Sequence, residues 1–407
     1  MTENRPRRHT RAPVRLGSSR AASMPRSAIR EIMALAAERP NVIHLEVGEP
    51  DSSTPQNIIE TAFKSARAGW TKYTSNAGLL SLRNFIARQT SLSWGNQVGP
   101  ERVIITTGAV GALFSALMSI VDPGDEVLIP DPGWPNYEAI LHLAGAKPIR
   151  FTLLPDQGFL PDPSEITRLI TVRTKAIVIN TPGNPTGALF PRSLIENLAV
   201  IAGRTGIYVV SDEVYEKIVF EGMHVSAGAI CPSDRVFVIS GFSKTYAMTG
   251  WRVGWLISPP LLSATAAGLQ EPITSCASTI AQKAGEAALE GDQRGIDEAR
   301  VIFLRRRNIM IDIFGNFDVL PVIPSGAFYA LIDISSTGRK SLDFAKDFLI
   351  THNTAVVPGI TFGPSCDRYI RVAFTTDDAS LREGLLRLRT YIEKLASAHN
   401  QFGPPKQ

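Results

Sequence analysis

The chain has 407 residues, more than a single hydrophobic core usually holds, so its length predicts two domains. Its composition is that of a globular protein, and its formal net charge is +4. Residues 1–30 hold eight arginines and one acid, so the positive charge belongs to the N-terminal tail and does not indicate a nucleic-acid-binding groove elsewhere.

We predict that residues 1–26 form a basic, disordered arm, because this segment has no periodic apolar residues. It lacks the apolar core of a secretory signal, and Pro6 and Pro13 would break the amphipathic helix of a transit peptide. Two long uncharged runs elsewhere are interrupted by turn residues, so neither makes a good membrane span. The three cysteines are scattered and form no CxxC pair. These features predict a cytoplasmic protein without disulfides, membrane contact or a metal site.

A helix over residues 27–36 and a short strand over 42–45 are the first predicted elements, and Gly48 follows them in the sequence Gly-Glu-Pro-Asp. A glycine at this point lets the backbone approach a ligand, although an ordinary turn explains it equally well. Tyr73 precedes a further helix, and its position alone indicates no more than a packing role.

From residue 103 onward, strands alternate with helices, which predicts a mostly parallel sheet flanked by helices. In open sheets of this type, ligands bind at the carboxyl ends of the strands. The strands are predicted over residues 103–106, 126–129, 176–179, 207–210 and 236–239, and two of the helices over 112–120 and 192–202.

Two groups of residues follow the first two of these strands. Gly108, Ala109 and Val110 lead into a helix, so their backbone N–H groups offer a site for a phosphate, although small-residue turns before helices are common. Trp134 follows the second strand, where its ring either stacks on an aromatic ligand or packs in the core.

Three more polar side chains follow the next two strands. Asn184 lies between two prolines and can donate a hydrogen bond to a phenolate oxygen. Asp212 can pair with a protonated ring nitrogen, and Tyr215 lies three residues further on. An acid at a strand end is usually just solvated, but the common position of these residues after successive strands favours a ligand site.

Lys244 follows the strand over 236–239, in a turn of small residues that includes Ser243, and Arg252 lies eight residues further on. A lysine held in a pocket can lose its proton and attack a carbonyl carbon, and an arginine can bind a phosphate. This stretch predicts a Schiff base with a phosphorylated aldehyde cofactor, although a surface lysine in a loop is equally compatible with the stretch taken alone.

After residue 290 the pattern changes to a long helix from 292 to about 313, a helix near 341–351 and short apolar runs. This change predicts a smaller α+β domain. We place the large domain at residues 47–290 and the small domain at 27–46 together with 291–407.

Arg371 lies within the otherwise apolar run 369–374. A charge in such a strand needs a partner. The partner is either an acid in a structural salt bridge or the carboxylate of a substrate, which an arginine can hold with two hydrogen bonds.

Seven segments carry a family likeness, and they are GEPD (48–51), YTSNAGLLSLR (73–83), NTPGNPTG (180–187), SDEVYE (211–216), GFSKTYAMTGWRVGW (241–255), SGAFY (325–329) and YIRVAF (369–374). In this order and spacing they resemble the fold-type I pyridoxal-phosphate-dependent aminotransferases of class I/II, the branch with aspartate, aromatic and broad-specificity enzymes. The likeness covers nearly everything after the tail. It implies an α/β large domain with a mostly parallel central sheet and a smaller α+β domain.

The resemblance implies a role for each matching residue. Lys244 is implied as the Schiff-base lysine and the base that moves the proton, Asp212 as the partner of the pyridine nitrogen, and Tyr215 as a donor to the ring oxygen. The other implied cofactor contacts are Asn184 at the same oxygen, Trp134 stacked on the ring, and Gly108, Ala109, Val110, Ser243 and Arg252 around the phosphate.

The resemblance also implies substrate and subunit contacts. Arg371 and the Gly48 backbone are implied to hold the substrate α-carboxylate, with Trp134 and Asn184 beside it. Tyr73 is implied to reach the phosphate in a neighbouring subunit, which predicts a homodimer.

The implied reaction moves an amino group from an L-amino acid to a 2-oxo acid, with 2-oxoglutarate as the acceptor that the family suggests, in a ping-pong cycle. Some aspartate aminotransferases of this branch have a lysine where Val110 stands, and that lysine can pair with a distal carboxylate. Valine cannot, which shifts the expectation towards an aromatic, branched or otherwise apolar amino donor. Two alternatives stay open: another pyridoxal-phosphate reaction, such as C–S β-elimination or cyclisation of the ACC-synthase kind, and a non-catalytic, cofactor-binding regulator.

Overall fold

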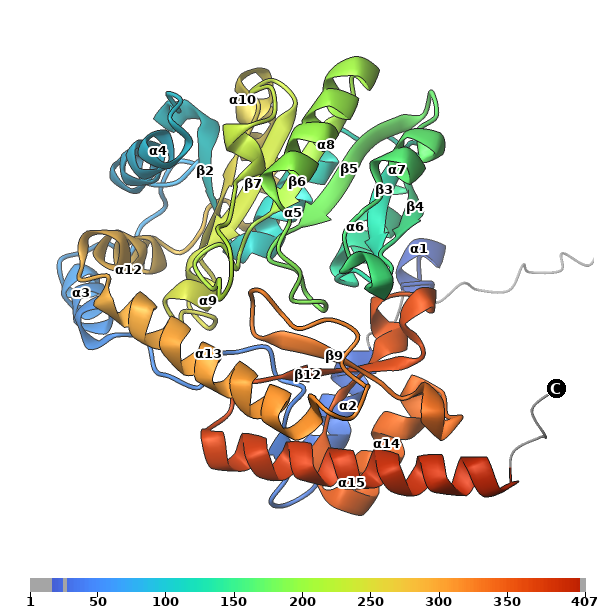
Figure 1. Cartoon of the computed structure of the whole chain (residues 1–407). Coiled ribbons are helices and arrows are strands. Elements are labelled where there is room, and N and C mark those ends of the chain that lie inside the picture. The colour runs from blue at the N-terminus through green and yellow to red at the C-terminus, as the bar shows by residue number, and fades with distance from the viewer. Residues whose placement is uncertain (1–16, 25–27, 403–407) are drawn as a thin grey trace, which may run out of the picture.

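The computed structural model describes residues 17–24 and 28–402 (Figure 1). A large domain built on a seven-stranded sheet occupies the upper part of Figure 1, and a smaller α+β domain lies below it. The predicted fold class is therefore confirmed. No helix within the described ranges combines the length and the apolar character needed to cross a membrane.

The central sheet has the strand order β2-β8-β7-β6-β5-β3-β4. Neighbouring strands from β7 to β4 run parallel, whereas β8 runs antiparallel to both of its neighbours, β2 and β7. The strands are β2 (Val103–Thr106), β3 (Glu126–Asp131), β4 (Lys147–Thr152), β5 (Thr174–Asn180), β6 (Tyr208–Asp212), β7 (Val236–Gly241) and β8 (Gly254–Ile257).

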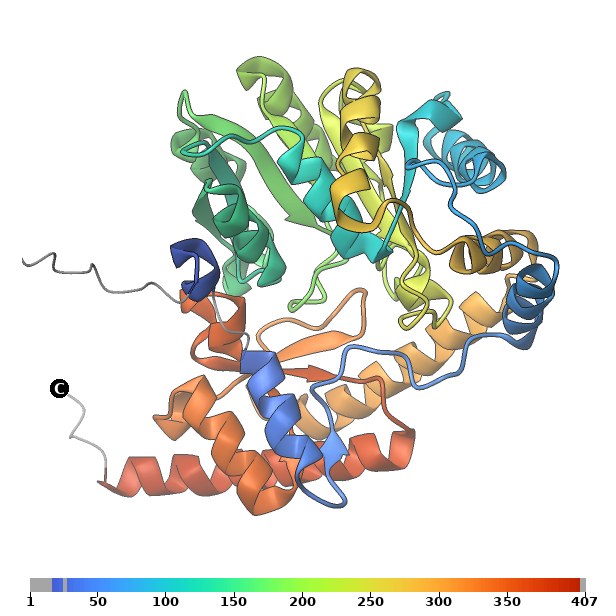
Figure 2. The same cartoon turned by 180° about the vertical axis from the view of Figure 1, so that it is seen from behind.

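Helices cover both faces of this sheet, as Figures 1 and 2 show from opposite sides for α8 and α5. Each face has its own apolar core, because successive side chains of a strand point to opposite faces: Val209 packs on one side and Val210 on the other. The helices of this domain are α3 (Gln56–Arg67), α4 (Leu80–Trp94), α5 (Gly108–Met118), α6 (Asn136–Ala144), α7 (Pro163–Leu169), α8 (Arg192–Thr205), α9 (Phe242–Thr245), α10 (Ser263–Gly268), α11 (Glu271–Thr274) and α12 (Thr279–Glu290).

The small domain combines the C-terminal part of the chain with a short N-terminal segment. A three-stranded antiparallel sheet has the order β11-β12-β9, and β1 pairs with β10 in parallel. Its elements are α2 (Ala28–Ala37), β1 (Ile43–His44), β9 (Tyr329–Asp333), β10 (Thr354–Ala355), β11 (Val357–Pro358), β12 (Tyr369–Ala373), α13 (Arg294–Phe314), α14 (Ser341–His352) and α15 (Asp378–Phe402). Ile32 and Leu45 pack into the same core as Phe344 and Leu385, which supports our domain boundaries; these stay a prediction.

Two local differences from the sequence expectations concern helices. α5 begins at Gly108, four residues before the predicted start, and Gly108 itself has a φ of 72°, which favours glycine at this turn into the helix. Part of the predicted disordered arm is a short helix, α1 (Ser19–Ala22), which lies on α6: Arg20 donates to the Leu143 carbonyl oxygen at 3.0 Å. Residues 1–16 and 25–26 of the predicted arm lie outside the described residues.

A buried arginine on α13 connects the two domains. Arg306 donates from both terminal nitrogens to the Asp51 carboxylate, at 2.9 and 2.6 Å, and from Nε to Asp378 at 3.1 Å. Burial disfavours the charged guanidinium, but these two carboxylates outweigh that effect and raise the pKa of Arg306. Because Asp51 lies three residues after Gly48, this ion-pair network fixes the far end of the Gly48 loop to α13 and α15.

Candidate functional site

A cavity of about 530 Å³ lies at the carboxyl ends of the sheet strands and is closed on its other side by small-domain residues. Most of the predicted site residues line it, namely Gly48, Ala109, Val110, Trp134, Asn184, Asp212, Tyr215, Ser243, Lys244, Arg252 and Arg371. Gly108 adjoins it, since a Cβ atom there would lie 2.7 Å from Arg252 Nη2. Tyr73 does not belong to this cavity: it is 86% exposed and lines a separate surface hollow.

The register of the sheet explains why side chains distant in sequence meet here. Asn180 is the residue paired with Asp212 across β5 and β6, and Asp212 is paired with Ile239 of β7. The chain leaves β7 at Gly241 and turns into the short helix α9, which contains Lys244. Parallel pairing thus brings the strand ends side by side at one edge.

Lys244 reaches into the cavity, where its Nζ donates a 2.6 Å hydrogen bond to the Gly48 carbonyl oxygen. Burial lowers the pKa of this amine to about 8; nearby Glu49 opposes the shift and the cations Arg371 and Arg252 reinforce it. An appreciable fraction of the amine is therefore neutral near physiological pH, as a nucleophile or a general base requires.

Asp212 is buried at the end of β6 and is held from two sides. The hydroxyl of Tyr137 donates to Oδ2 at 2.8 Å, and the Val214 amide donates to Oδ1 at 3.4 Å. Burial raises the pKa of the carboxyl to about 6, and the hydrogen bonds offset this only in part. A carboxylate in this position is ready to pair with a cationic group of a ligand, because the protein gives it no nearby cation within ion-pair distance among the described residues.

The raised pKa of Asp212 predicts a pH-dependent stability in the ligand-free chain. The folded state holds this proton up to about pH 6, whereas an unfolded aspartate loses it near pH 4, so the stability contribution is present below pH 4 and is lost as the pH rises through 6. Asp212→Asn removes the ionisation, and we expect it to raise the unfolding free energy by up to about 3 kcal/mol at pH 8 and by little at pH 4. Denaturant titrations of the ligand-free chain at both pH values measure this. A variant that is less stable than the parent at pH 8 would contradict it.

Arg371 is buried and has no acid within ion-pair distance among the residues that the structure describes. Its Nη1 donates to Asn184 Oδ1 at 3.1 Å and its Nη2 to the Glu46 carbonyl oxygen at 2.6 Å, while Nε has no partner. The Tyr329 ring lies 4.3 Å from the guanidinium, and burial lowers the pKa of Arg371. Of the two explanations for this residue, a structural salt bridge is not found among the described residues, and the binding of a ligand carboxylate stays a prediction.

The opposite part of the cavity offers a site for a second anion. The N-terminus of α5 presents the backbone N–H groups of Ala109 and Val110, and Arg252 lies against Gly108. A Cβ on Gly254 would lie 2.7 Å from the Ala109 nitrogen, so β8 approaches the start of this helix as closely as a glycine permits. Unpaired N–H groups and a guanidinium at one point fit a phosphate group.

Three residues that hydrogen-bond to predicted site residues were not singled out in the sequence. Tyr137 approaches Asp212 from α6. Asn180 donates to the Asp212 carbonyl oxygen at 2.9 Å and accepts from the Asn184 amide at 2.7 Å, which fixes the loop after β5. Tyr329 shares a 3.0 Å hydrogen bond with Tyr215 and fills the space beside Gly48. Asn180 and Tyr329 lie within two of the quoted segments, but Tyr137 had no signal.

A cluster of polar groups around Glu213 supports the end of β6. Glu213 Oε1 accepts from the Ser211 hydroxyl at 2.7 Å and the Ala227 amide at 2.9 Å, and Oε2 faces His224 Nε2 at 3.0 Å. Burial opposes the charge on His224, but Glu213 outweighs it and raises the pKa of that imidazole. These contacts engage both Glu213 oxygens and fix the backbone that leads from Asp212 to Tyr215.

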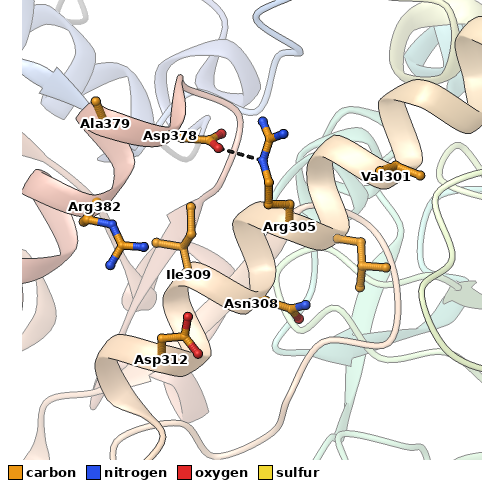
Figure 3. A pocket seen from close by; sticks show the side chains of 9 residues that line it. Val301, Arg305, Asn308, Ile309, Asp312, Asp378, Ala379 and Arg382 are labelled. Atoms are coloured by element: carbon orange, nitrogen blue, oxygen red, sulfur yellow. Dashed lines mark ion pairs between the residues drawn. The ribbon is translucent and has the colours of Figure 1, made fainter.

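A larger hollow of about 760 Å³ lies on the surface between α13 and α15 (Figure 3). Arg305 Nε and Asp378 form a 2.7 Å ion pair across it, and Arg382 and Asp312 lie along its rim. It contains none of the predicted site residues, so size alone does not identify the functional cavity here.

Comparison with known proteins gives consistent matches over most of the chain. A family model described as aminotransferase class I and II matches residues 40–388. The aspartate/prephenate aminotransferase of Thermus thermophilus is 37% identical over 350 residues, covering 85% of this chain and 90% of that protein. The structure of aspartate aminotransferase from Thermus thermophilus with maleate has a TM-score of 0.89 at 36% identity, covering 93% of this chain and all of that one. The aromatic aminotransferase of Pyrococcus horikoshii has a TM-score of 0.84 at 32% identity, covering 90% of this chain and 99% of that one.

Proposed function

From the premise that the chain belongs to the aminotransferase class I and II family, we propose that it uses pyridoxal 5′-phosphate to move an amino group from an L-amino acid to a 2-oxo acid. The observation that carries this proposal is the enclosure of Lys244, Asp212 and Arg371 in one cavity. A partly neutral amine, a buried carboxylate and a guanidinium without a counter-ion are the groups that this chemistry needs together.

The residues of the cavity fit the cofactor group by group. The α5 N-terminus with Arg252 and Ser243 would hold the phosphate, Trp134 would cover the ring, and Asp212 would accept a hydrogen bond from the protonated pyridine nitrogen. When bound, pyridoxal phosphate acts as an electron sink for the electron pair that the substrate Cα releases. An ionised Asp212 keeps the ring nitrogen protonated, which this role requires.

We propose that Asn184 and Tyr215 donate hydrogen bonds to the ring oxygen of the cofactor. The side-chain oxygen of Asn184 already accepts from Arg371, so its Nδ2 group is left to donate. The hydroxyl of Tyr215 is paired with that of Tyr329, which orients it. Arg371 then has two functions: it fixes the Asn184 amide, and it would bind the substrate α-carboxylate through Nε, which has no partner among the described residues, together with a neighbouring terminal nitrogen.

Lys244 is the base that we assign to the proton transfer. Its neutral amine would take the proton from the substrate Cα and deliver it to the cofactor carbon within the same half-reaction, and it would move a proton in the opposite direction in the second half-reaction. The cations Arg371 and Arg252 help to keep the amine neutral, because they lower its pKa.

For the substrates, we propose 2-oxoglutarate as acceptor and an amino acid with an aromatic or apolar side chain as donor. Ile29, Met33, Val47 and Val110 are apolar residues of the cavity lining, with which such a side chain would make contact. The names of the relatives include aspartate, prephenate and aromatic substrates, so the family accommodates both polar and aromatic side chains.

The visible absorption spectrum of the purified, cofactor-loaded protein tests the proposal. We expect a yellow protein whose band bleaches on addition of a donor amino acid, with oxo-acid product in stoichiometric amount and a clear preference within an amino-acid panel. Release of ammonia and pyruvate would instead indicate elimination. A protein that stays colourless after incubation with the cofactor would refute the assignment of Lys244.

We also propose a homodimer and a cytoplasmic location. Tyr73 supports the dimer, because it is exposed and outside its own cavity, in a loop whose Trp70 is also partly exposed. Sedimentation of the purified chain would report a monomer if this is incorrect. The cytoplasmic location stays a prediction.

A further inference from the structure

The cavity contains a fourth cation whose role is not explained by the proposed chemistry. Lys244, Arg252 and Arg371 each have a proposed partner, but Arg30 of α2 also lines the cavity. α2 lies towards the viewer in Figure 2 and belongs to the small domain, on the side of the cavity away from the sheet. Arg30 was not among the residues that the sequence singled out.

The charge of Arg30 has no counter-ion within the described residues. Three acids line the same cavity, and each has another partner: Glu46 faces His44 at 2.8 Å, Glu49 accepts from the Thr249 hydroxyl, and Asp212 accepts from the Tyr137 hydroxyl at 2.8 Å. Arg30 forms no ion pair or side-chain hydrogen bond with any residue of the described chain, and its side chain is exposed. A long, exposed arginine side chain can keep its head group in solvent, where it is free for a ligand.

We propose that Arg30 binds the distal carboxylate of a dicarboxylic substrate, 2-oxoglutarate in the first place. The inference rests on the proposed function, because it assumes that Arg371 holds the carboxylate next to the reacting carbon. A five-carbon dicarboxylate then has a second carboxylate that Val110 cannot bind, and Arg30 is the remaining cation among the described residues that line the cavity. The planar guanidinium matches a carboxylate with two parallel hydrogen bonds.

This assignment also explains how one cavity accepts two kinds of side chain. A long exposed arginine can turn into solvent when an aromatic or apolar donor occupies the space, leaving Ile29, Met33, Val47 and Val110 as the contact surface. When the dicarboxylic acceptor enters, the same side chain turns inward. Donor and acceptor can then alternate, as a ping-pong cycle requires.

Equilibrium binding to the cofactor-loaded protein tests the proposal without turnover. Glutarate and pentanoate are unreactive and have the same carbon chain, and only glutarate has the distal carboxylate. We expect Arg30→Gln to weaken glutarate binding by about 10- to 100-fold in calorimetry and to leave pentanoate unchanged, because charge-assisted hydrogen bonds are lost only for the dicarboxylate. Arg30→Lys should retain part of the preference. Arg168→Gln, which removes an exposed arginine of α7 outside the cavity, is the matched control.

Steady-state rates give a second readout. In Arg30→Gln, kcat/KM should fall for 2-oxoglutarate and stay constant for 2-oxopentanoate. The proposal would be overturned if Arg30→Gln weakened the binding of glutarate and pentanoate equally, lowered kcat/KM equally for 2-oxoglutarate and 2-oxopentanoate, or changed neither quantity. Should the parent protein bind glutarate with an Arg30-dependent preference yet transfer no amino group, the proposed function would fail while the assignment of Arg30 would stand. Amino-group transfer without an Arg30-dependent preference for glutarate would refute the assignment of Arg30 and leave the proposed function standing.

Discussion

Replacement of Lys244 by alanine is expected to abolish amino-group transfer, with a loss in kcat of about 10⁴-fold or more. The amine is the only proposed nucleophile and base of the site, and general acid–base catalysis alone contributes about 10²- to 10⁴-fold. The variant should fold normally, because a lysine whose pKa burial lowers to about 8 is held partly charged in an unfavourable environment at pH 7.

The measurement is single-turnover transfer to 2-oxoglutarate, together with thermal unfolding of the same samples. Lys394→Ala, an exposed lysine on α15, is the matched control and should keep full activity. Substantial transfer by the Lys244→Ala protein would show that another group performs the proton transfer.

Arg371→Met is expected to separate activity from stability. The substitution should lower kcat/KM by about 10²- to 10³-fold, because loss of one member of a buried, hydrogen-bonded charge pair costs about 2–5 kcal/mol of binding. The ligand-free protein should lose little stability, because removal of the buried charge offsets the loss of the hydrogen bonds to Asn184 and to the Glu46 carbonyl oxygen. Methionine removes a buried charge that has no counter-ion in the described chain, and it fills a similar volume between Tyr329 and Phe362.

Steady-state kinetics and thermal unfolding at one pH measure both effects. The matched control is Arg368→Met. Arg368 is an exposed arginine outside the cavity that pairs with Asp333, so its replacement should leave kcat/KM unchanged. Parallel losses of activity and stability in the Arg371 variant would mean that the residue is structural and that the carboxylate is bound elsewhere.

Much of the site follows from one regularity of the sequence, the placement of unusual side chains directly after apolar strands. Parallel strands end at one edge, so Asn184, Asp212 and Lys244 were expected to meet, and the register from β5 to β7 brings them to one cavity. The start of α5 was misplaced by four residues, because glycine has a low helix propensity and Gly108 and Gly111 appeared to be turn residues.

The missed residues approach the cavity from elements whose orientation a single sequence does not reveal. Tyr137 comes from the outer helix α6, Tyr329 from the small-domain sheet and Arg30 from the N-terminal helix α2. The positions of Tyr329 and Arg30 depend on how the two domains pack, and that of Tyr137 depends on how α6 packs on the sheet. Local sequence patterns encode neither. The sequence likewise left both explanations of Arg371 open, because only the packed structure shows whether an acid lies beside it.

The segment from Gly48 to Asp51 contacts a different domain at each of its two ends, so it links the two domains. Lys244 holds the Gly48 carbonyl, and Arg306 holds the Asp51 carboxylate. A reaction at Nζ of Lys244 would break the hydrogen bond to Gly48 and leave the ion pair between Arg306 and Asp51 intact. Binding of the cofactor would therefore make this segment more mobile, and we expect faster hydrogen exchange at the Glu49 and Asp51 amides in the loaded protein. Unchanged exchange would show that other contacts hold the segment. The hydrogen bond of Lys244 would then also control when the small domain can move relative to the large one.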